Sequence, residues 1–433
     1  MGKYAAKTNR SKRIPLKKDP MKKGKVIDLQ DGRASMRVEI PFDPAALFEE
    51  GLEQLFADIG QTVIVSLLED ETEKIAGEKN AKNDGGTANR HGYEEGSVYV
   101  GGIKRPILRP RVRQDGHEIE LKRYAALRSP QRIERSVYNR VLAKVTTRRY
   151  QNAVEDLEEG FGIQRSSVSR HWQAASAKEV ERLMTRSLKE LDFNVLLIDG
   201  VVLQGETIVA ALGIDTEGGK HVLGIWEGGT ENTDTVVSLL NDLVDRGLKK
   251  DRSYLFVLDG SKALNKGVKD IFGSKAHIQR CLVHKKRNVL SHLPQNHQKM
   301  ASVRMSAAWG MTDYEEAKKA LLSTIDWLEK LNLPAANSLR EGLEETLTLH
   351  RLAVPSKLRL SLNSTNTIEN LFSFFRDQTK RVKTWRAKNN MRRRWACTIL
   401  LEAESRFRRI RHYKEMSALS SILGNLPALD KIA

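Results

Sequence analysis

The sequence of 433 residues predicts a mixed α/β fold in which helices cover a sheet of parallel and antiparallel strands. Three strand-like segments follow one another between residues 193 and 228, and such short connections allow only an antiparallel meander. Strand-like and helix-like segments then alternate up to residue 294, which is typical of parallel crossovers. From 295 to 355 the pattern is helical and lacks strand signals, which predicts an all-α insertion.

The N-terminal part of the chain is predicted to contain a tail, a helical region and a small β element. Residues 1–30 are rich in Lys and Arg, so we expect a basic disordered tail. Apolar residues recur at helical spacing in 31–90, whereas 91–130 contains short alternating runs interrupted by Gly and Pro. The first pattern predicts helices and the second predicts strands.

A helix-turn-helix is predicted within residues 131–185. The run EDLEEGFGIQRSSVSRHW joins an acidic amphipathic segment to a second helix that begins near Arg165, with glycines between them. In this layout the second helix presents its first residues to a DNA groove. The candidate DNA-contacting residues are Gln164, Arg165, Ser167 and Arg170. An ordinary helical hairpin is the alternative, because glycine turns join helices in many proteins.

Two apolar runs in the predicted core, residues 186–294, end in an Asp-Gly pair. NVLLIDG contains Asp199, and YLFVLDG contains Asp259. A buried carboxylate is costly unless a cation or a hydrogen-bond donor meets it. If the two strands are neighbours, their spacing of about 4.8 Å brings the carboxylates together, and such oxygen ligands suit Mg²⁺. Alternatively, Asp199-Gly200 forms a type I′ hairpin turn, and the run Asp259-Gly260-Ser261 caps the following helix.

A third carboxylate, Glu369, lies in residues 356–433, the predicted second part of the core. The run STNTIENLFSFFRDQTKRVK has an apolar stripe at helical spacing, and Glu369 lies on a second stripe of the same helix. The cations on this second stripe are Arg376, Lys380 and Lys383. Alternatively, Asn366 caps the helix and Glu369 closes a capping box.

The net charge of +18 is concentrated in two blocks. Residues 1–25 carry ten Lys and Arg against one Asp, and residues 372–414 carry fourteen against three acidic residues. Basic blocks attract polyphosphates by counterion release, whereas binding to a membrane surface would also need an apolar face. Nucleic acid is therefore the expected partner. A solvated tail without a partner is the alternative for residues 1–25.

Composition also predicts the cellular location. No apolar run approaches the roughly 20 residues that span a bilayer, and the N-terminus lacks the layout of a secretory signal. The two cysteines, Cys281 and Cys397, fit a reducing compartment without a disulfide framework. We therefore expect a cytoplasmic protein without membrane association.

Together, these residues resemble the bacterial Mutator-type DDE transposases of insertion sequences. The resemblance covers about residues 90–411, including the helical insertion that precedes STNTIEN. The residues that carry it are Asp199, Asp259, Glu369, Cys281 and His284 in the run CLVH, and Arg376 seven residues after the Glu. One departure is Val236, which stands where the family usually has Trp, and it puts any aromatic role there in doubt.

The resemblance implies a ribonuclease-H-like catalytic core that cleaves DNA strands and transfers them at the ends of the element. It implies two Mg²⁺ ions, replaceable by Mn²⁺, between Asp199, Asp259 and Glu369. Cys281 and His284 would support this active site, while a zinc site would need further ligands such as His277 and His292. Arg376, Lys380 and Lys383 would contact DNA.

The expected partners are double-stranded DNA, as terminal inverted repeats and as target, and a second copy of the chain in a synaptic homodimer. The expected location is the bacterial cytoplasm, in association with the nucleoid. Two alternatives stay open: a nuclease or junction resolvase on the same core, and a DNA-binding protein derived from a transposase that lacks catalysis.

Overall fold

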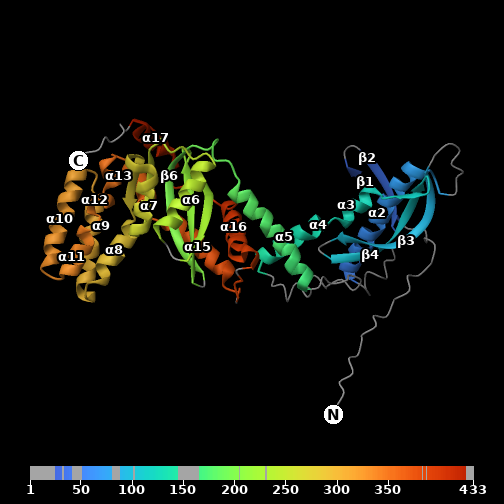
Figure 1. Ribbon diagram of the computed structural model, residues 1–433, viewed down its shortest axis with the longest axis horizontal. Coiled ribbons are helices and arrows are strands. Elements are labelled where there is room, and N and C mark those ends of the chain that lie inside the picture. Colours follow the sequence, from blue (N-terminus) through green and yellow to red (C-terminus); the bar gives the residue numbers. More distant parts are fainter. Residues whose placement is uncertain are drawn as a thin grey trace, which may run out of the picture. The chain divides into compact units, whose positions relative to one another are not determined.

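The computed structural model describes residues 25–31, 34–40, 51–79, 88–100, 103–144, 165–203, 205–229, 232–382, 384–386 and 388–425 (Figure 1). These residues belong to two compact units, 1–171 and 172–433, each with its own apolar core. The division falls within helix α5 (Arg165–Met184).

In the first unit, helix α2 packs against a three-stranded antiparallel sheet of order β3-β4-β5. Leu68 of the helix is buried with Val98, Ile107 and Val112 of the sheet. The predicted β element therefore exists, but its last part is the helix α3, whose sequence KRYAALR is rich in helix formers. The bounds are α2 (Gly51–Ala76), β3 (Ala88–Val100), β4 (Ile103–Gln114), β5 (His117–Ile119), α3 (Lys122–Arg128) and α4 (Pro130–Leu142).

A two-stranded hairpin, β1 (Lys25–Asp31) and β2 (Ala34–Ile40), also lies in the first unit. The structure differs here from the prediction, which places the end of the tail and the start of a helical region in this part of the chain. An Asp-Gly pair between two runs rich in apolar residues is a hairpin signal, and Asp31 pairs with Ala34 across that connection.

The second unit is built on a five-stranded sheet of order β10-β9-β6-β7-β8. Strands β6, β7 and β8 form the predicted antiparallel meander, whereas β9 pairs in parallel with both β6 and β10. The predicted mixed α/β class is therefore confirmed. The bounds are β6 (Phe193–Leu203), β7 (Glu206–Asp215), β8 (Lys220–Gly228), α6 (Thr233–Asp245), β9 (Tyr254–Leu258), α7 (Lys262–Phe272), β10 (Ala276–Arg280) and α8 (Leu282–Ser291).

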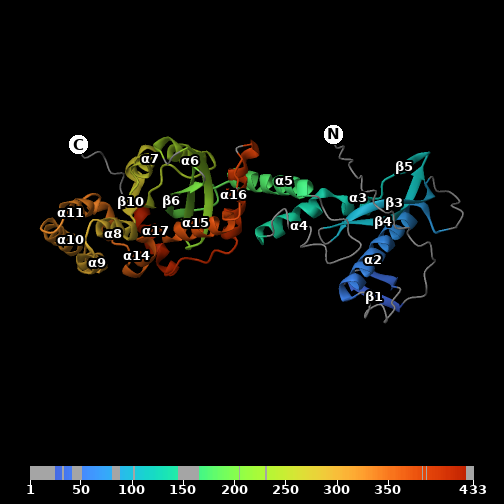
Figure 2. The same cartoon turned by 90° about the horizontal axis from the view of Figure 1, so that it is seen from below.

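Helices cover both faces of this sheet (Figure 2). On one face, Leu239 and Leu243 of α6 and Val268 of α7 are buried in one cluster with Phe256 of β9. The opposite face carries three later helices, two of which contact β6 and one β8. These helices are α15 (Asn366–Thr379), α16 (Met391–Glu404) and α17 (Met416–Asn425). Within the described ranges, no helix is long and apolar enough to cross a bilayer.

The all-α insertion lies between α8 and α15. Its longer helices pack with α8 around a separate core that contains Met305, Leu321 and Leu339. Its last two short helices contact the edge strand β10. The bounds are α9 (Gln295–Gly310), α10 (Tyr314–Glu329), α11 (Leu333–Arg340), α12 (Leu343–Thr346) and α13 (Thr348–Arg351), followed by α14 (Ser356–Leu362).

Candidate active site

The register between β6 and β9 relates Asp199 to Asp259. Each paired residue of β6 meets the residue 60 positions later, from Val195 with Leu255 to Leu197 with Val257. Two residues beyond the pair of Leu197 and Val257, the same offset aligns Asp199 with Asp259, the residue that follows β9. Neighbouring strands lie about 4.8 Å apart and equivalent residues of parallel strands face the same side, so the register supports the expected proximity.

Local hydrogen bonds hold both aspartates. Oδ1 of Asp199 accepts from the backbone N of Gly200 at 2.8 Å, and Oδ1 of Asp259 accepts from the backbone N of Ser261 at 2.8 Å. Both carboxylates are half-buried. The hairpin-turn alternative does not apply, because Asp199 pairs with Ala210 inside the β6–β7 ladder. The capping alternative is confirmed through Ser261, whose side chain caps α7, while Asp259 itself lies two residues before the cap.

Glu369 lies in the first turn of α15, a helix that packs against β6. Its Oε1 accepts a hydrogen bond of 2.6 Å from the hydroxyl of Thr365, which is the N-cap residue. The alternative with Asn366 as the cap is therefore wrong, since Asn366 is already the first helical residue. The cap lies one residue earlier, which puts Glu369 one position beyond that of a capping box.

Thr365 also connects Glu369 to the run CLVH. Thr365 is buried, and its hydroxyl lies 3.3 Å from Sγ of Cys281 and 3.4 Å from Nδ1 of His284. The Thr365 backbone N donates to the same sulfur at 3.4 Å. Cys281 follows β10 as the N-cap of α8, so the end of one strand and the start of two helices meet here. Cys281 and His284 therefore belong to a hydrogen-bonded network behind Glu369.

The same group has the composition of a metal site. Sγ of Cys281, a ring nitrogen of His284 and a carboxylate oxygen of Glu369 lie within 4.8 Å of one another. The Thr365 hydroxyl, however, is within 3.4 Å of all three. A structural zinc site needs a fourth ligand. Among the described residues, neither His277 nor His292 belongs to this group. The arrangement favours a hydrogen-bonded network.

Electrostatic effects link two of the carboxylates through His284. A hydrogen bond with Cys281 raises the pKa of His284, burial opposes this rise, and the negative charges of Cys281, Glu369 and Asp259 add to it. Burial by itself would raise the pKa of Cys281, but hydrogen bonds from His284 and Thr365 lower it below its ordinary value. Asp259, which follows β9, and Glu369 of α15 thus both favour the protonated form of one imidazole.

Two of the three cations predicted for this stripe, Arg376 of α15 and Lys380 just after it, are exposed. Arg376 and Lys380 line an open hollow of about 490 Å³ together with Leu203, the last residue of β6. Glu369 precedes Arg376 on the same helix, and Asp199 precedes Leu203 on the same strand. The third predicted cation, Lys383, lies outside the described residues.

The predicted DNA-reading segment is described in part. Helix α5 begins at Arg165, as expected, although the structure describes nothing of the Arg165 side chain. Arg170 is exposed and donates to the hydroxyl of Ser167 at 3.0 Å, while Val168 is buried. Gln164 and the expected turn lie outside the described residues, so the helix-turn-helix stays a prediction.

Comparison with known proteins identifies the family. A family model described as "Transposase, Mutator family" matches residues 43–409. The chain belongs to this family of transposases. Its match begins at residue 43, whereas the expected resemblance begins near residue 90, so the Mutator-family region also includes α2 and the β3–β5 sheet.

Three curated relatives of this Mutator-family chain are insertion-sequence transposases. The transposase for ISRM5 of Rhizobium meliloti (strain 1021) is 30% identical over 343 residues, which cover 75% of this chain and 82% of the relative. The transposase for IS905 of Lactococcus lactis subsp. lactis (strain IL1403) is 27% identical, covering 77% and 85%. The transposase for IS256 in transposon Tn4001 of Staphylococcus aureus is 25% identical, covering 74% and 83%.

Thr365 is not among the site residues predicted from the sequence of this Mutator-family chain. A Thr four residues before an acidic residue at a helix start was the available signal, because one helical turn brings such residues together. The link to Cys281 joins residues 84 positions apart and depends on tertiary packing.

Proposed function

We propose that this chain is a DDE transposase that cleaves DNA at the ends of an insertion sequence and joins the freed ends to target DNA. The observation that carries the proposal is the arrangement of three acidic residues in a Mutator-family chain. The β6–β9 register relates Asp199 to Asp259, and the helix that carries Glu369, α15, packs against β6, the strand of Asp199. The sheet supports a ribonuclease-H-like core, because an antiparallel meander is followed by parallel crossovers.

The three acidic residues fit hard divalent cations. They offer only carboxylate oxygens in a half-buried setting, which is the ligand type that Mg²⁺ prefers and that Mn²⁺ also accepts. When bound, two such ions would activate the attacking oxygen and stabilise the leaving oxygen of a phosphodiester. The chain's own contribution is to hold the ligands: backbone N–H groups fix Asp199 and Asp259, and the Thr365 hydroxyl fixes Glu369.

The partners follow from the same reaction. Double-stranded DNA enters both as the element's terminal inverted repeats and as the target. A homodimer in the synaptic complex would give each of the two element ends one active site. Chromosomal DNA places the reaction at the nucleoid, in the bacterial cytoplasm.

A reaction with purified protein and the DNA that flanks its gene tests the proposed function. Labelled duplexes that carry the flanking inverted repeats are incubated with Mg²⁺ and a target plasmid. We expect cleavage at the repeat and covalent joining to the target. Cleavage without joining would indicate the nuclease or resolvase alternative, and binding without cleavage would indicate the non-catalytic one.

Specific and nonspecific DNA contacts should be separable. We expect Arg165→Ala and Arg170→Ala to weaken discrimination for the element's own ends by roughly 1–3 kcal/mol per lost base contact. Deletion of residues 1–25 should instead weaken binding to all duplexes about equally and flatten the salt dependence, because this basic segment would contact phosphates. The measurement is the Kd for end and random duplexes over a salt series. Equal losses on both duplexes for the Arg variants would refute a base-reading role for α5.

Arg376 is expected to position the DNA end. It lies seven residues after Glu369, about 10.5 Å along the helix at 1.5 Å per residue, and faces the hollow at the end of β6. Arg376→Ala should reduce strand transfer while metal-dependent cleavage persists, because the carboxylates are unchanged. The control is Arg304→Ala, which removes the same charge from α9 of the insertion, where Arg304 lies over Trp327.

Crosslinking from position 376 provides the direct measurement for this prediction. We expect a crosslink within a few nucleotides of the cleavage site. The alternative is that Arg376 only forms a surface ion pair with a nearby carboxylate, worth at most about 1 kcal/mol. Absence of such a crosslink, combined with normal strand transfer by Arg376→Ala, would favour this alternative.

A further inference from the structure

Arg280 lies beside the turn that follows Asp259. It is the last residue of β10 and pairs with Leu258, the residue before Asp259. Its side chain is only 9% exposed. A Cβ atom added to Gly260 would lie 2.4 Å from Nη2 of Arg280, so the guanidinium packs directly on the Asp259-Gly260-Ser261 turn. Only glycine at position 260 admits this contact without a shift of the guanidinium.

The all-α insertion fixes the Arg280 guanidinium. Nη1 and Nη2 donate to the two carboxylate oxygens of Glu341 at 3.2 and 2.9 Å. A Cβ atom added to Gly342 would lie 2.4 Å from Nη1, and the φ of Gly342 is +66°, a conformation that favours glycine. Two glycines, one beside the predicted metal ligand and one in the insertion, therefore enclose the same guanidinium.

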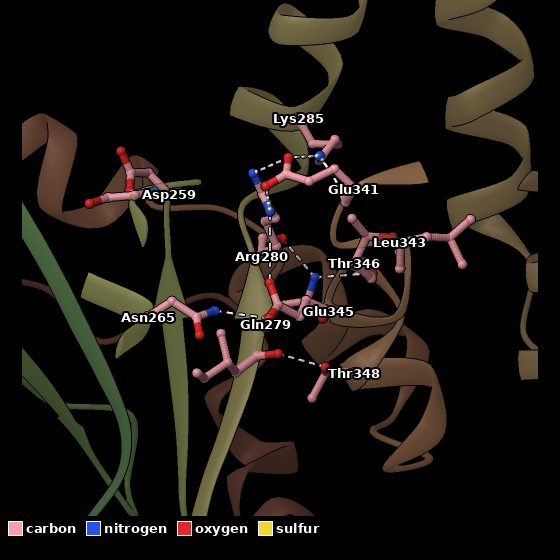
Figure 3. Close-up of polar contacts among 12 residues, drawn as sticks. Asp259, Asn265, Gln279, Arg280, Lys285, Glu341, Leu343, Glu345, Thr346 and Thr348 are labelled. Carbon is pink, nitrogen blue, oxygen red and sulfur yellow. Dashed lines mark hydrogen bonds and ion pairs between the residues drawn. The ribbon is translucent and has the colours of Figure 1, made fainter. Parts of the chain in front are cut away.

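Lys285 of α8 holds Glu341 in turn. The Lys285 side chain is fully buried, and its Nζ donates to Oε2 of Glu341 at 3.2 Å and to the carbonyl of Ser338 at 2.6 Å (Figure 3). Ser338 lies in the last turn of α11, where unpaired carbonyls favour a cation. Two buried cations thus converge on one carboxylate of the insertion.

Attachment of the insertion to the sheet does not by itself require Arg280. Gln279 donates to the carbonyl of Thr346 at 3.1 Å, and the Thr348 hydroxyl donates to the carbonyl of Ile278 at 2.6 Å. These bonds already cover the edge of β10 farther from Asp259 (Figure 3). Arg280 differs from them because it joins the insertion to the Asp259 turn.

We infer that Arg280 is a positioning residue for Asp259, and that the all-α insertion contributes to the active site through Glu341. Arg280, held by Glu341, keeps the Asp259-Gly260-Ser261 turn in the conformation that presents the Asp259 carboxylate to a divalent cation. This inference rests on the proposed function, in which Asp259 is a metal ligand.

Mn²⁺ titration of the purified protein, followed by electron paramagnetic resonance of the free ion, tests the inference without relying on catalysis. We expect Arg280→Ala to weaken Mn²⁺ binding about 10–100-fold, as is typical when a group that orients a metal ligand is removed. Glu341→Gln should weaken it less but in the same direction. The control is Glu344→Gln, because Glu344 bonds only to Lys318 and Tyr314 among the contacts described for its carboxylate. Mn²⁺ binding by this variant should be unchanged.

A double-substitution cycle separates positioning from general stability. Gly260→Ala should weaken Mn²⁺ binding when Arg280 is present, because the added methyl group displaces the guanidinium. The same change should have little further effect in the Arg280→Ala background, where nothing is displaced. Thermal unfolding of each variant identifies losses of Mn²⁺ binding that arise from unfolding. Glu341→Gln is a milder change than Arg280→Ala, because the Glu341 side chain is half-exposed.

The outcomes are distinguishable. The inference would be overturned by unchanged Mn²⁺ binding in Arg280→Ala and Glu341→Gln, or by additive effects in the cycle. In that case, loss of Mn²⁺ binding in Asp259→Asn would still uphold the metal role of Asp259. Normal Mn²⁺ binding by Asp259→Asn itself would overturn that metal role, and the inference about Arg280 with it.

Discussion

Asp199→Asn, Asp259→Asn or Glu369→Gln is expected to abolish both DNA cleavage and strand transfer while leaving binding to the element ends largely intact. Each change keeps the size of the side chain but removes the charge that holds a cation. Loss of electrostatic stabilisation in the transition state typically costs at least 10²–10³-fold in rate, and removal of a metal ligand is expected to cost more. DNA affinity depends mainly on cationic contacts with phosphates, which these changes do not touch.

The measurements are cleavage and joining of labelled element ends, with Kd determined on the same duplexes. Asp192→Asn is a matched control, because Asp192 is an exposed residue just before β6 that pairs with Lys249 and Arg252. Exposed ion pairs contribute at most about 1 kcal/mol, so this control should retain activity. A variant of any of the three acidic residues that joined ends at the wild-type rate would exclude that residue from the active site.

The core sheet could be predicted because its signals are local and strong. Residues Tyr254–Leu258 are all buried, as expected for a parallel strand covered on both faces, and this burial produces an unbroken apolar run. Strands β6, β7 and β8 are joined by short connections in the sequence, and such connections allow only an antiparallel meander. The expected proximity of Asp199 and Asp259 was conditional on their strands being neighbours, and the observed pairing of β6 with β9 meets that condition.

The groups that hold the site could not be predicted, because they depend on contacts between distant residues. Cys281 and Thr365 are 84 positions apart, and Arg280 and Glu341 are 61 positions apart. Periodicity in the sequence indicates which face of a helix is buried, but it does not indicate which side chain of another element meets that face. The N-cap of α15 shows the same limit, since both Thr365 and Asn366 are suitable cap residues by type.

Thr365→Val is expected to reduce cleavage and strand transfer together by about 10–100-fold, the usual cost of losing a group that orients a metal ligand. Valine has nearly the same shape as threonine but cannot donate to Oε1 of Glu369. It also leaves Sγ of Cys281 and Nδ1 of His284 without the hydroxyl that lies 3.3 and 3.4 Å from them. Glu369 would then lose its only described side-chain donor within the first turn of α15.

Thr365→Ser distinguishes this role from a packing role, because serine keeps the hydroxyl and removes only a methyl group. We expect Ser to retain most of the activity and Val to lose it, although Val fills the buried site better. Burying polar groups without a partner costs about 1–3 kcal/mol, so the melting temperature of each variant must be measured beside the rates. If activity followed the melting temperature, or if Val were as active as Ser, the hydroxyl would have no part in orienting Glu369. A low rate for Val at unchanged Kd for element ends, with both variants folded at the assay temperature, would instead place the defect in the chemical step.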